Sequence, residues 1–158
     1  MTHHDGHTHS DAEIATLNTL TATLIDSVNG YEDAAANSDN DRLRSMFRDC
    51  ANERNAAVNE LRGEIRRLGG TPEDDGSFLG KTHQRFLDLK AAVMGRDEKA
   101  IINEVERGED YLKEKFEAAL NSDKLTSESR AAVERAFQSV RAGHDKMSAL
   151  KHGMEASS

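Results

Sequence analysis

The 158-residue sequence contains no tryptophan, one proline and one cysteine, and aromatic residues make up only 4% of it. Aromatic and β-branched residues are the usual strand formers, so their scarcity disfavours a sheet protein and favours an all-α fold. The single cysteine, Cys50, has no partner for an internal disulfide. A reducing compartment such as the cytoplasm is therefore the simplest setting for the chain.

Other absences limit the classes of partner. No apolar run approaches the ~18 residues of a membrane-spanning helix, and no charged-then-apolar leader opens the chain. Basic residues do not dominate either, since 21 Lys and Arg stand against 29 Asp and Glu, for a net charge of -8. Nucleic acids and anionic lipid surfaces both need a basic footprint. We therefore expect neither a nucleic-acid partner nor a membrane.

Helical periodicity and turn residues predict four long helices and one of half length. A capping box, Ser10-Asp11-Ala12-Glu13, marks the start of the first helix, because its Ser and Glu side chains can satisfy each other's backbone N–H groups. Ser77 is expected to cap the half-length helix. The expected helices cover residues 10–37, 41–68, 77–94, 97–120 and 127–152.

The two ends of the chain are expected to lie outside the helical domain. Residues 1–9 offer no apolar anchor and carry the histidines His3, His4, His7 and His9. We expect residues 1–9 to be a disordered tail, residues 10–152 to form the domain, and residues 153–158 to form a second tail. Four imidazoles can bind a transition metal, but a mobile segment gives them no fixed geometry.

The half-length helix predicts the topology. At 1.5 Å per residue it spans ~25 Å, enough with its flanking loop to return the chain to the end where the second helix begins. The second and third long helices would then run parallel, as in ferritin-like bundles with one long crossover. The expected fold is therefore an all-α, ferritin-like four-helix bundle with a short crossover helix between the second and third long helices.

Ionisable side chains gather on the inward faces at two adjacent levels, which is unusual for the interior of a bundle. The predicted polar core consists of Glu32, Glu53, Arg54, Glu104, Glu109 and His144. Gly108 lies between the two levels. Because a glycine inside a helix costs roughly 1 kcal/mol relative to alanine, we expect Gly108 to have a packing reason, which is to leave room for the Arg54 side chain.

Two interpretations of this core remain open. In one, the Arg54 guanidinium forms hydrogen-bonded ion pairs with one or two carboxylates, and His144 pairs with Glu104. These pairs would fix the register of the helices. In the other, the core binds iron or manganese, and its metal ligands are Glu32, Glu104, Glu109 and His144. The pattern for a di-iron centre is incomplete, because neither Glu53 nor His144 belongs to the Glu-x-x-His pair that such a centre uses.

Several sequence pieces, taken together, resemble a known family. They include Gly30-Tyr31-Glu32, Leu68-Gly69-Gly70-Thr71-Pro72, Glu104-Val105-Glu106-Arg107-Gly108-Glu109-Asp110 and His144-Asp145. Between residues 17 and 150 the chain resembles the small bacterial ferritin-like four-helix-bundle proteins that are catalogued as a domain of unknown function. The resemblance implies a ferritin-like bundle in a bacterial cytoplasm, a stress-related setting and no established reaction. The polar-core positions it carries over are Glu32, Arg54, Glu104, Glu109 and His144.

These features favour a non-catalytic protein that acts through self-association, as a homo-oligomer, or through a protein partner. No catalytic residue is assigned, and no cofactor is certain. The alternative is a metal-binding ferritin-like protein that holds iron or manganese in an incomplete carboxylate and histidine site. If the protein is an enzyme, the resemblance implies a ferritin-like metal-dependent oxidoreductase.

Overall fold

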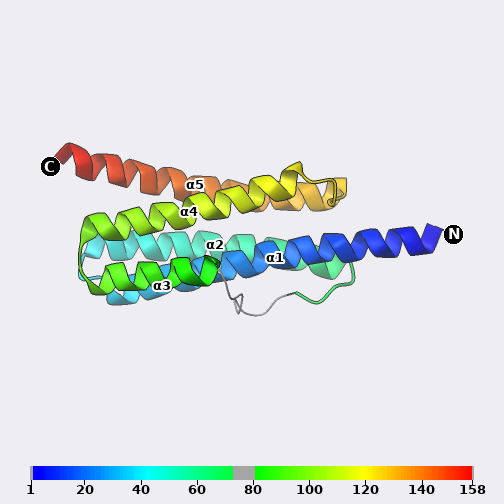
Figure 1. Cartoon of the computed structure of the whole chain (residues 1–158), viewed down its shortest axis with the longest axis horizontal. Coiled ribbons are helices and arrows are strands. Elements are labelled where there is room, and N and C mark those ends of the chain that lie inside the picture. Colours follow the sequence, from blue (N-terminus) through cyan, green and yellow to red (C-terminus); the bar gives the residue numbers. More distant parts are fainter. Residues whose placement is uncertain (1, 73–80, 158) are drawn as a thin grey trace.

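The computed structural model of the chain describes residues 2–72 and 81–157. It is all-helical, with five helices and no strand in these ranges (Figure 1). The helices are α1 (Thr2–Asn37), α2 (Asp41–Arg67), α3 (Lys81–Met94), α4 (Glu98–Asn121) and α5 (Ser127–Ser157). The all-α class predicted from composition is confirmed. None of the described helices combines the length and the apolar composition that crossing a bilayer would require.

The start of α1 differs from the prediction. The helix begins at Thr2, well before the Ser10 start that the capping box indicated. The Glu13 side chain is buried and accepts a 2.6 Å hydrogen bond from the backbone N–H of Thr126, in the turn between α4 and α5. A tertiary contact therefore takes the carboxylate that the local pattern assigned to capping.

Both segments predicted as tails contain helical backbone. Residues 2–9 belong to α1, and α5 continues to Ser157, so it covers most of residues 153–158. The expected start of the half-length helix, Ser77, lies outside the described residues, and α3 is described from Lys81.

The two ends of α2, Asp41 and Arg67, lie within one residue of the predicted range 41–68. Asn40 has extended backbone angles, and its side-chain oxygen accepts from the Leu43 N–H at 3.0 Å, which makes it the N-cap. After the helix, Gly69 has a φ of 84°, a left-handed conformation that glycine adopts without strain. Gly70 lies so near α1 that a Cβ would be 2.9 Å from the Ile14 side chain. A bare backbone at Gly70 therefore lets the end of α2 pack against α1.

The helices pack in a ring with one weak side. α1 packs along α2, α2 along α5 and α5 along α4, whereas α1 and α4 meet directly over little of their length. α3 contacts both α1 and α4 and covers part of that weak side (Figure 1). The colours in Figure 1 show that α2 and α4 run in the same direction, with α3 between them in the chain. This is the direction that the predicted crossover requires.

The core is apolar along most of its length. The largest fully buried apolar side chains include Phe47, Phe116, Leu17, Leu24, Leu61, Ile65 and Ile102. Among the described residues, the buried polar or charged ones are Glu13, Thr21, Thr23, Ser38, Arg54, Glu64, Glu109 and Ser129. A buried charge without a partner is costly. Each charged member of this set therefore needs a partner, and these partners define the polar regions of the interior.

Candidate functional site

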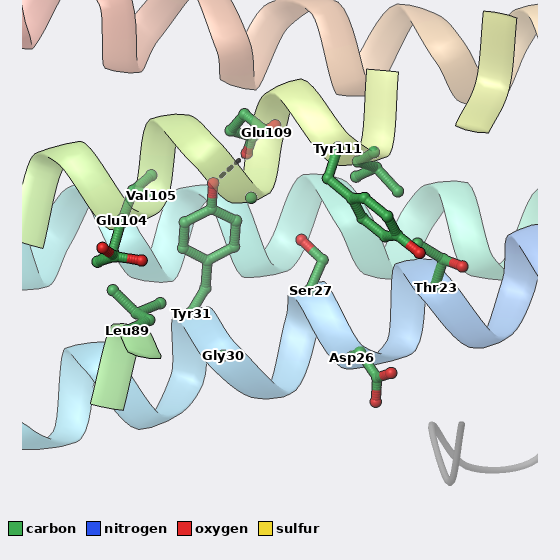
Figure 2. Close-up of a pocket in the computed structure, with 12 residues that line it drawn as sticks. Thr23, Asp26, Ser27, Gly30, Tyr31, Leu89, Glu104, Val105, Glu109 and Tyr111 are labelled. Carbon is green, nitrogen blue, oxygen red and sulfur yellow. Dashed lines mark hydrogen bonds between the residues drawn. The ribbon is translucent and has the colours of Figure 1, made fainter. Parts of the chain in front are cut away.

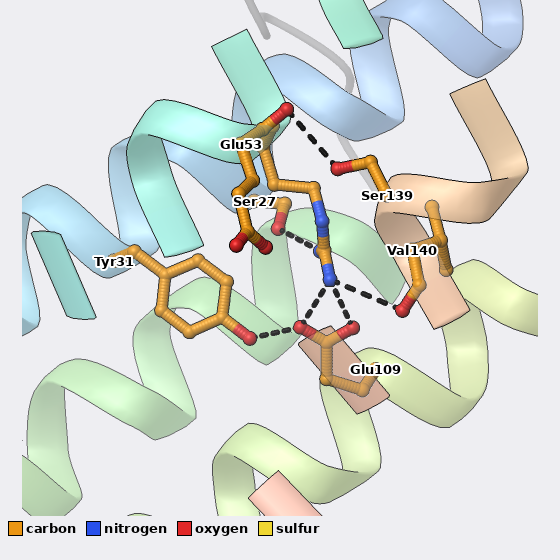
Figure 3. A network of polar contacts seen from close by, with 7 residues as sticks. Ser27, Tyr31, Glu53, Glu109, Ser139 and Val140 are labelled. Carbon is orange, nitrogen blue, oxygen red and sulfur yellow. Dashed lines mark hydrogen bonds and ion pairs between the residues drawn. The ribbon is translucent and has the colours of Figure 1, made fainter. Parts of the chain in front are cut away.

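Arg54 is the centre of the main polar region. It lies on the buried face of α2, one turn after Cys50, and its residue is 0% exposed. Its Nη2 donates to both carboxylate oxygens of Glu109, at 2.7 Å and 2.6 Å, and Glu109 on α4 is itself only 2% exposed (Figure 3). Nη1 donates to the Ser27 hydroxyl oxygen at 3.0 Å, and Nη2 also reaches the backbone oxygen of Val140 at 3.4 Å. One guanidinium therefore joins α1, α2, α4 and α5.

Tyr31 completes this network from α1. Its buried hydroxyl donates to Glu109 Oε1, and its ring centroid lies 5.7 Å from the Arg54 guanidinium carbon. Burial, together with the negative charge of Glu109, raises the pKa of the Tyr31 hydroxyl well above its usual value. Burial lowers the pKa of Arg54, but Glu109, together with Tyr31 and Cys50, raises it, so that the pKa lies above its usual value. Tyr31 thus stays a neutral donor, and Arg54 stays charged.

Gly143 provides the space that Arg54 occupies. A Cβ on Gly143 of α5 would lie 2.1 Å from Arg54 Nη2 and 3.3 Å from Glu109 Oε1. The sequence indicated Gly108 for this role, and that prediction is wrong, because a Cβ on Gly108 would meet no atom within 4 Å. The two glycines differ because α5 approaches Arg54 with its backbone, whereas Gly108 faces open space.

A small pocket lies beside the network, between α1, α3 and α4 (Figure 2). Its volume is about 60 Å³, room for a few water molecules. The described residues that line it are Thr23, Asp26, Ser27, Gly30, Tyr31, Leu89, Glu104, Val105, Gly108, Glu109, Tyr111 and Leu112. Two of these residues, Tyr31 and Glu109, also belong to the Arg54 network, so the pocket and the network share a wall.

Glu104 lines this pocket, whereas Glu32 does not. Its Oε1 accepts from the Arg107 guanidinium at 2.7 Å, and its side chain is 17% exposed. Its Oε2 is buried and has no hydrogen-bond partner. Glu32 is exposed on α1, because Tyr31, one residue earlier, takes the inward position at this turn.

Glu53 lies at the edge of the polar region. Its carboxylate pairs with Lys146 of α5, its backbone oxygen accepts from the Ser139 hydroxyl at 3.0 Å, and its side chain is half-buried. The hydrogen bond to Glu53 raises the pKa of Lys146. The sixth predicted core residue, His144, has a side chain that lies outside the described residues.

Of the four predicted metal ligands, the structure brings Glu104 and Glu109 to the same pocket and leaves Glu32 outside it. Glu109 has both oxygens on Arg54, Glu104 lines the pocket, and Glu32 faces solvent. Across the described ranges, no group of three or more His, Cys, Asp or Glu side chains is placed to hold a metal ion. Moreover, the Arg54 charge would repel a cation at the Glu109 carboxylate.

A second buried polar cluster, which the sequence did not reveal, lies near the C-terminal end of α2. The Glu64 carboxylate accepts from Arg67 at 2.9 Å and 2.5 Å and from the buried Ser129 hydroxyl at 2.7 Å. Arg67 also pairs with Glu128 of α5 at 2.8 Å. Hydrogen bonds from Arg67 and Ser129 lower the pKa of Glu64 against the opposing effect of burial. The i, i+3 spacing of Glu64 and Arg67 was the only sequence signal for this cluster.

Cys50 packs beside the network without reactive character. It is free and fully buried, and burial, with the nearby Glu109 charge, raises the pKa of its thiol to about 12. Because the thiolate is the reactive form, Cys50 acts as a small core residue.

The comparisons with known proteins give one family. A family model described as "Domain of unknown function (DUF2383)" matches residues 12–122, more than half of the chain. The matched range contains Arg54, Glu109, Tyr31 and every described residue that lines the pocket, whereas Gly143 of α5 lies beyond it. The search among curated proteins found no match.

Proposed function

This chain belongs to the DUF2383 family, and we propose that it is a ferritin-like four-helix-bundle protein that acts non-catalytically, through self-association or a protein partner. In this proposal the buried polar network fixes the register of the four long helices, and the outer surface of the bundle makes the functional contacts. The ferritin-like part is supported by the parallel course of α2 and α4, with α3 as the crossover between them.

The observation that carries the proposal is the pairing of Arg54 with Glu109. Both side chains are essentially unexposed, and one Arg54 nitrogen lies within 2.7 Å of both Glu109 oxygens. In this proposal the Arg54 guanidinium takes the place that a bound cation has in a ferritin-like centre. A buried network of this kind favours one arrangement of helices, and both carboxylate oxygens of Glu109 are engaged by Arg54.

The alternative function is iron or manganese binding in the bundle core. It predicts stoichiometric metal in the purified protein and a melting temperature that changes when the metal is added. We would prepare the full chain with His3, His4, His7 and His9 replaced by asparagine, so that the terminal imidazoles cannot bind metal. The purified protein is then analysed for metal and melted with and without iron(II) or manganese(II). We expect no stoichiometric metal and an unchanged melting temperature.

Two controls make the result decisive. Stoichiometric metal that disappears in Glu104→Ala but persists in Glu117→Ala, a change on the exposed face of α4, would contradict the non-catalytic proposal. Light scattering on the same samples measures self-association. A dimer or larger assembly supports that route, whereas a monomer at all concentrations rejects self-association and leaves only a heterologous partner.

A further inference from the structure

We infer that the pocket between α1, α3 and α4 is a binding site for a small neutral alcohol, a short aliphatic body with one hydroxyl group (Figure 2). The inference goes beyond the proposed function, because it concerns a cavity that the Arg54 network borders but does not fill. Three observations carry it: the glycines that keep the space open, the charge balance of the walls, and one buried acceptor oxygen.

Two glycines inside helices, Gly30 of α1 and Gly108 of α4, line the pocket. Glycine inside a helix is less stable than alanine. At Gly108 this loss is not offset by close packing, because an added Cβ would meet no atom within 4 Å. The missing side chain at Gly108 therefore leaves open the volume that an alanine methyl group would take.

The walls of the pocket carry carboxylates, but their charges are balanced. Arg54 lies 2.6 Å from Glu109, and Arg107 lies 2.7 Å from Glu104. Asp26 also has a partner. Cations of the chain itself lie beside the two tyrosine rings of the lining. An ion that entered the pocket would lose its hydration without meeting an unbalanced charge, so the pocket favours a neutral ligand.

Apolar side chains form much of the remaining wall. Leu89 of α3, together with Val105 and Leu112 of α4, offers aliphatic surface on which CH₂ groups can be buried. The volume is about 60 Å³. One water-sized position takes about 10–15 Å³, so the ligand is limited to about four non-hydrogen atoms.

Glu104 supplies the acceptor for the hydroxyl group. Its Oε1 accepts from Arg107, whereas its Oε2 is buried and accepts no hydrogen bond from any residue that the structure describes. A buried acceptor without a donor costs free energy. The O–H of an alcohol can donate to Oε2 and remove that cost, and a ketone of the same size cannot.

The glycines of the pocket also report its occupancy. The full chain, labelled with nitrogen-15, is titrated with n-propanol while two-dimensional NMR spectra follow the backbone amides of Gly30 and Gly108. Gly63, which is exposed on α2, is the internal reference. We expect saturable shifts at Gly30 and Gly108 and none at Gly63, with a dissociation constant in roughly the millimolar range for so small a ligand.

Two other probes of similar size define the ligand class. Acetone, which accepts but does not donate, should bind about tenfold more weakly than n-propanol, as expected for loss of a hydrogen bond to a charged acceptor. The n-propylammonium ion donates but is charged, and it should also bind more weakly than n-propanol. In Glu104→Gln the neutral amide replaces the carboxylate, so the preference for n-propanol over acetone should fall.

Two glycine variants locate the site. Gly108→Ala fills part of the pocket and should weaken n-propanol binding about tenfold, measured at the Gly30 amide. Gly63→Ala is the matched control, since it also adds a methyl group to a helix where the added Cβ meets no atom within 4 Å, but it lies outside the pocket lining. It should leave the affinity unchanged, and urea midpoints show whether each variant is folded.

Each opposite result would reject the inference. These results are the absence of saturable shifts with n-propanol, equal binding of acetone, tighter binding of n-propylammonium, and equal affinities in Gly108→Ala and Gly63→Ala. None of them changes the metal content or the assembly state that test the proposed function, so either proposal can fail alone.

Discussion

At the scale of single residues, Gly143 and Gly108 have opposite consequences for the network around Arg54. Gly143→Ala would place a Cβ 2.1 Å from Arg54 Nη2, and the guanidinium cannot move aside without leaving Glu109. We expect the substitution to lower the free energy of unfolding by about 3 kcal/mol, the range for overpacking or for breaking a buried ion pair.

At Gly108, by contrast, an added Cβ meets no atom within 4 Å. Gly108→Ala should therefore raise the free energy of unfolding by about 0.5–1 kcal/mol. Urea denaturation measures both, and wild-type stability in Gly143→Ala would contradict the packing described.

The same residues show how far sequence reasoning reached. Arg54 and Glu109 were both predicted for the polar core, and Arg54 was expected to pair with carboxylates, because a charge on an apolar stripe must find a partner. The structure identifies Glu109 as that carboxylate. Tyr31 was not among the predicted polar-core residues, since its sequence spacing does not reveal that its hydroxyl donates to Glu109. Gly143 could not be identified, because the need for a glycine depends on which backbone approaches the guanidinium, and that is a tertiary fact.

At the scale of helices, the Asn40 cap holds the start of α2 and joins it to α4. Its side-chain oxygen accepts from Leu43, and its Nδ2 donates to the Glu98 carboxylate in the first turn of α4. Asn40→Ala should lower stability by about 1 kcal/mol, the usual cost of losing an N-cap. Asn40→Ser keeps a capping oxygen but loses the contact with Glu98, so it should lower stability less than Asn40→Ala does. Urea unfolding measures the stability of both variants, and an equal loss in the two would assign the effect to the Glu98 contact. Asn59→Ala, at an exposed position inside α2, is the neutral control.

Helix ends were predictable where the signal is local. The expected ranges 41–68 and 97–120 lie within one residue of the observed α2 and α4. Capping side chains such as Asn40 and Asp97, and the glycines after α2, act on neighbouring backbone groups, so a local pattern can locate these ends. The start of α1 was misplaced because the Ser10 to Glu13 pattern is also local in form, whereas Glu13 bonds to Thr126 across the molecule. Local patterns cannot exclude such a competing partner.

At the scale of the whole molecule, the Glu64 cluster couples stability to pH. Hydrogen bonds from Arg67 and Ser129 hold the pKa of Glu64 below its unfolded value of about 4.5. For a carboxyl whose folded pKa is depressed, the unfolded state binds the proton more readily, so protonation favours unfolding. The stability that Glu64 contributes is therefore complete above its unfolded pKa and is lost as pH falls through its lower folded pKa.

This argument predicts a pH-dependent difference between wild type and Glu64→Gln. Above about pH 5.5, the variant should be less stable by a constant amount, because the interaction of the carboxylate with Arg67 is missing. Below that pH, the two unfolding free energies should converge, as wild-type Glu64 becomes protonated and loses the same interaction. Urea unfolding at a series of pH values measures the difference, with Glu117→Gln as the control for loss of one acidic charge. A difference that stays constant down to pH 3 would show that Glu64 stabilises the fold through packing. The contact between the end of α2 and the start of α5 would then not depend on the charge of Glu64.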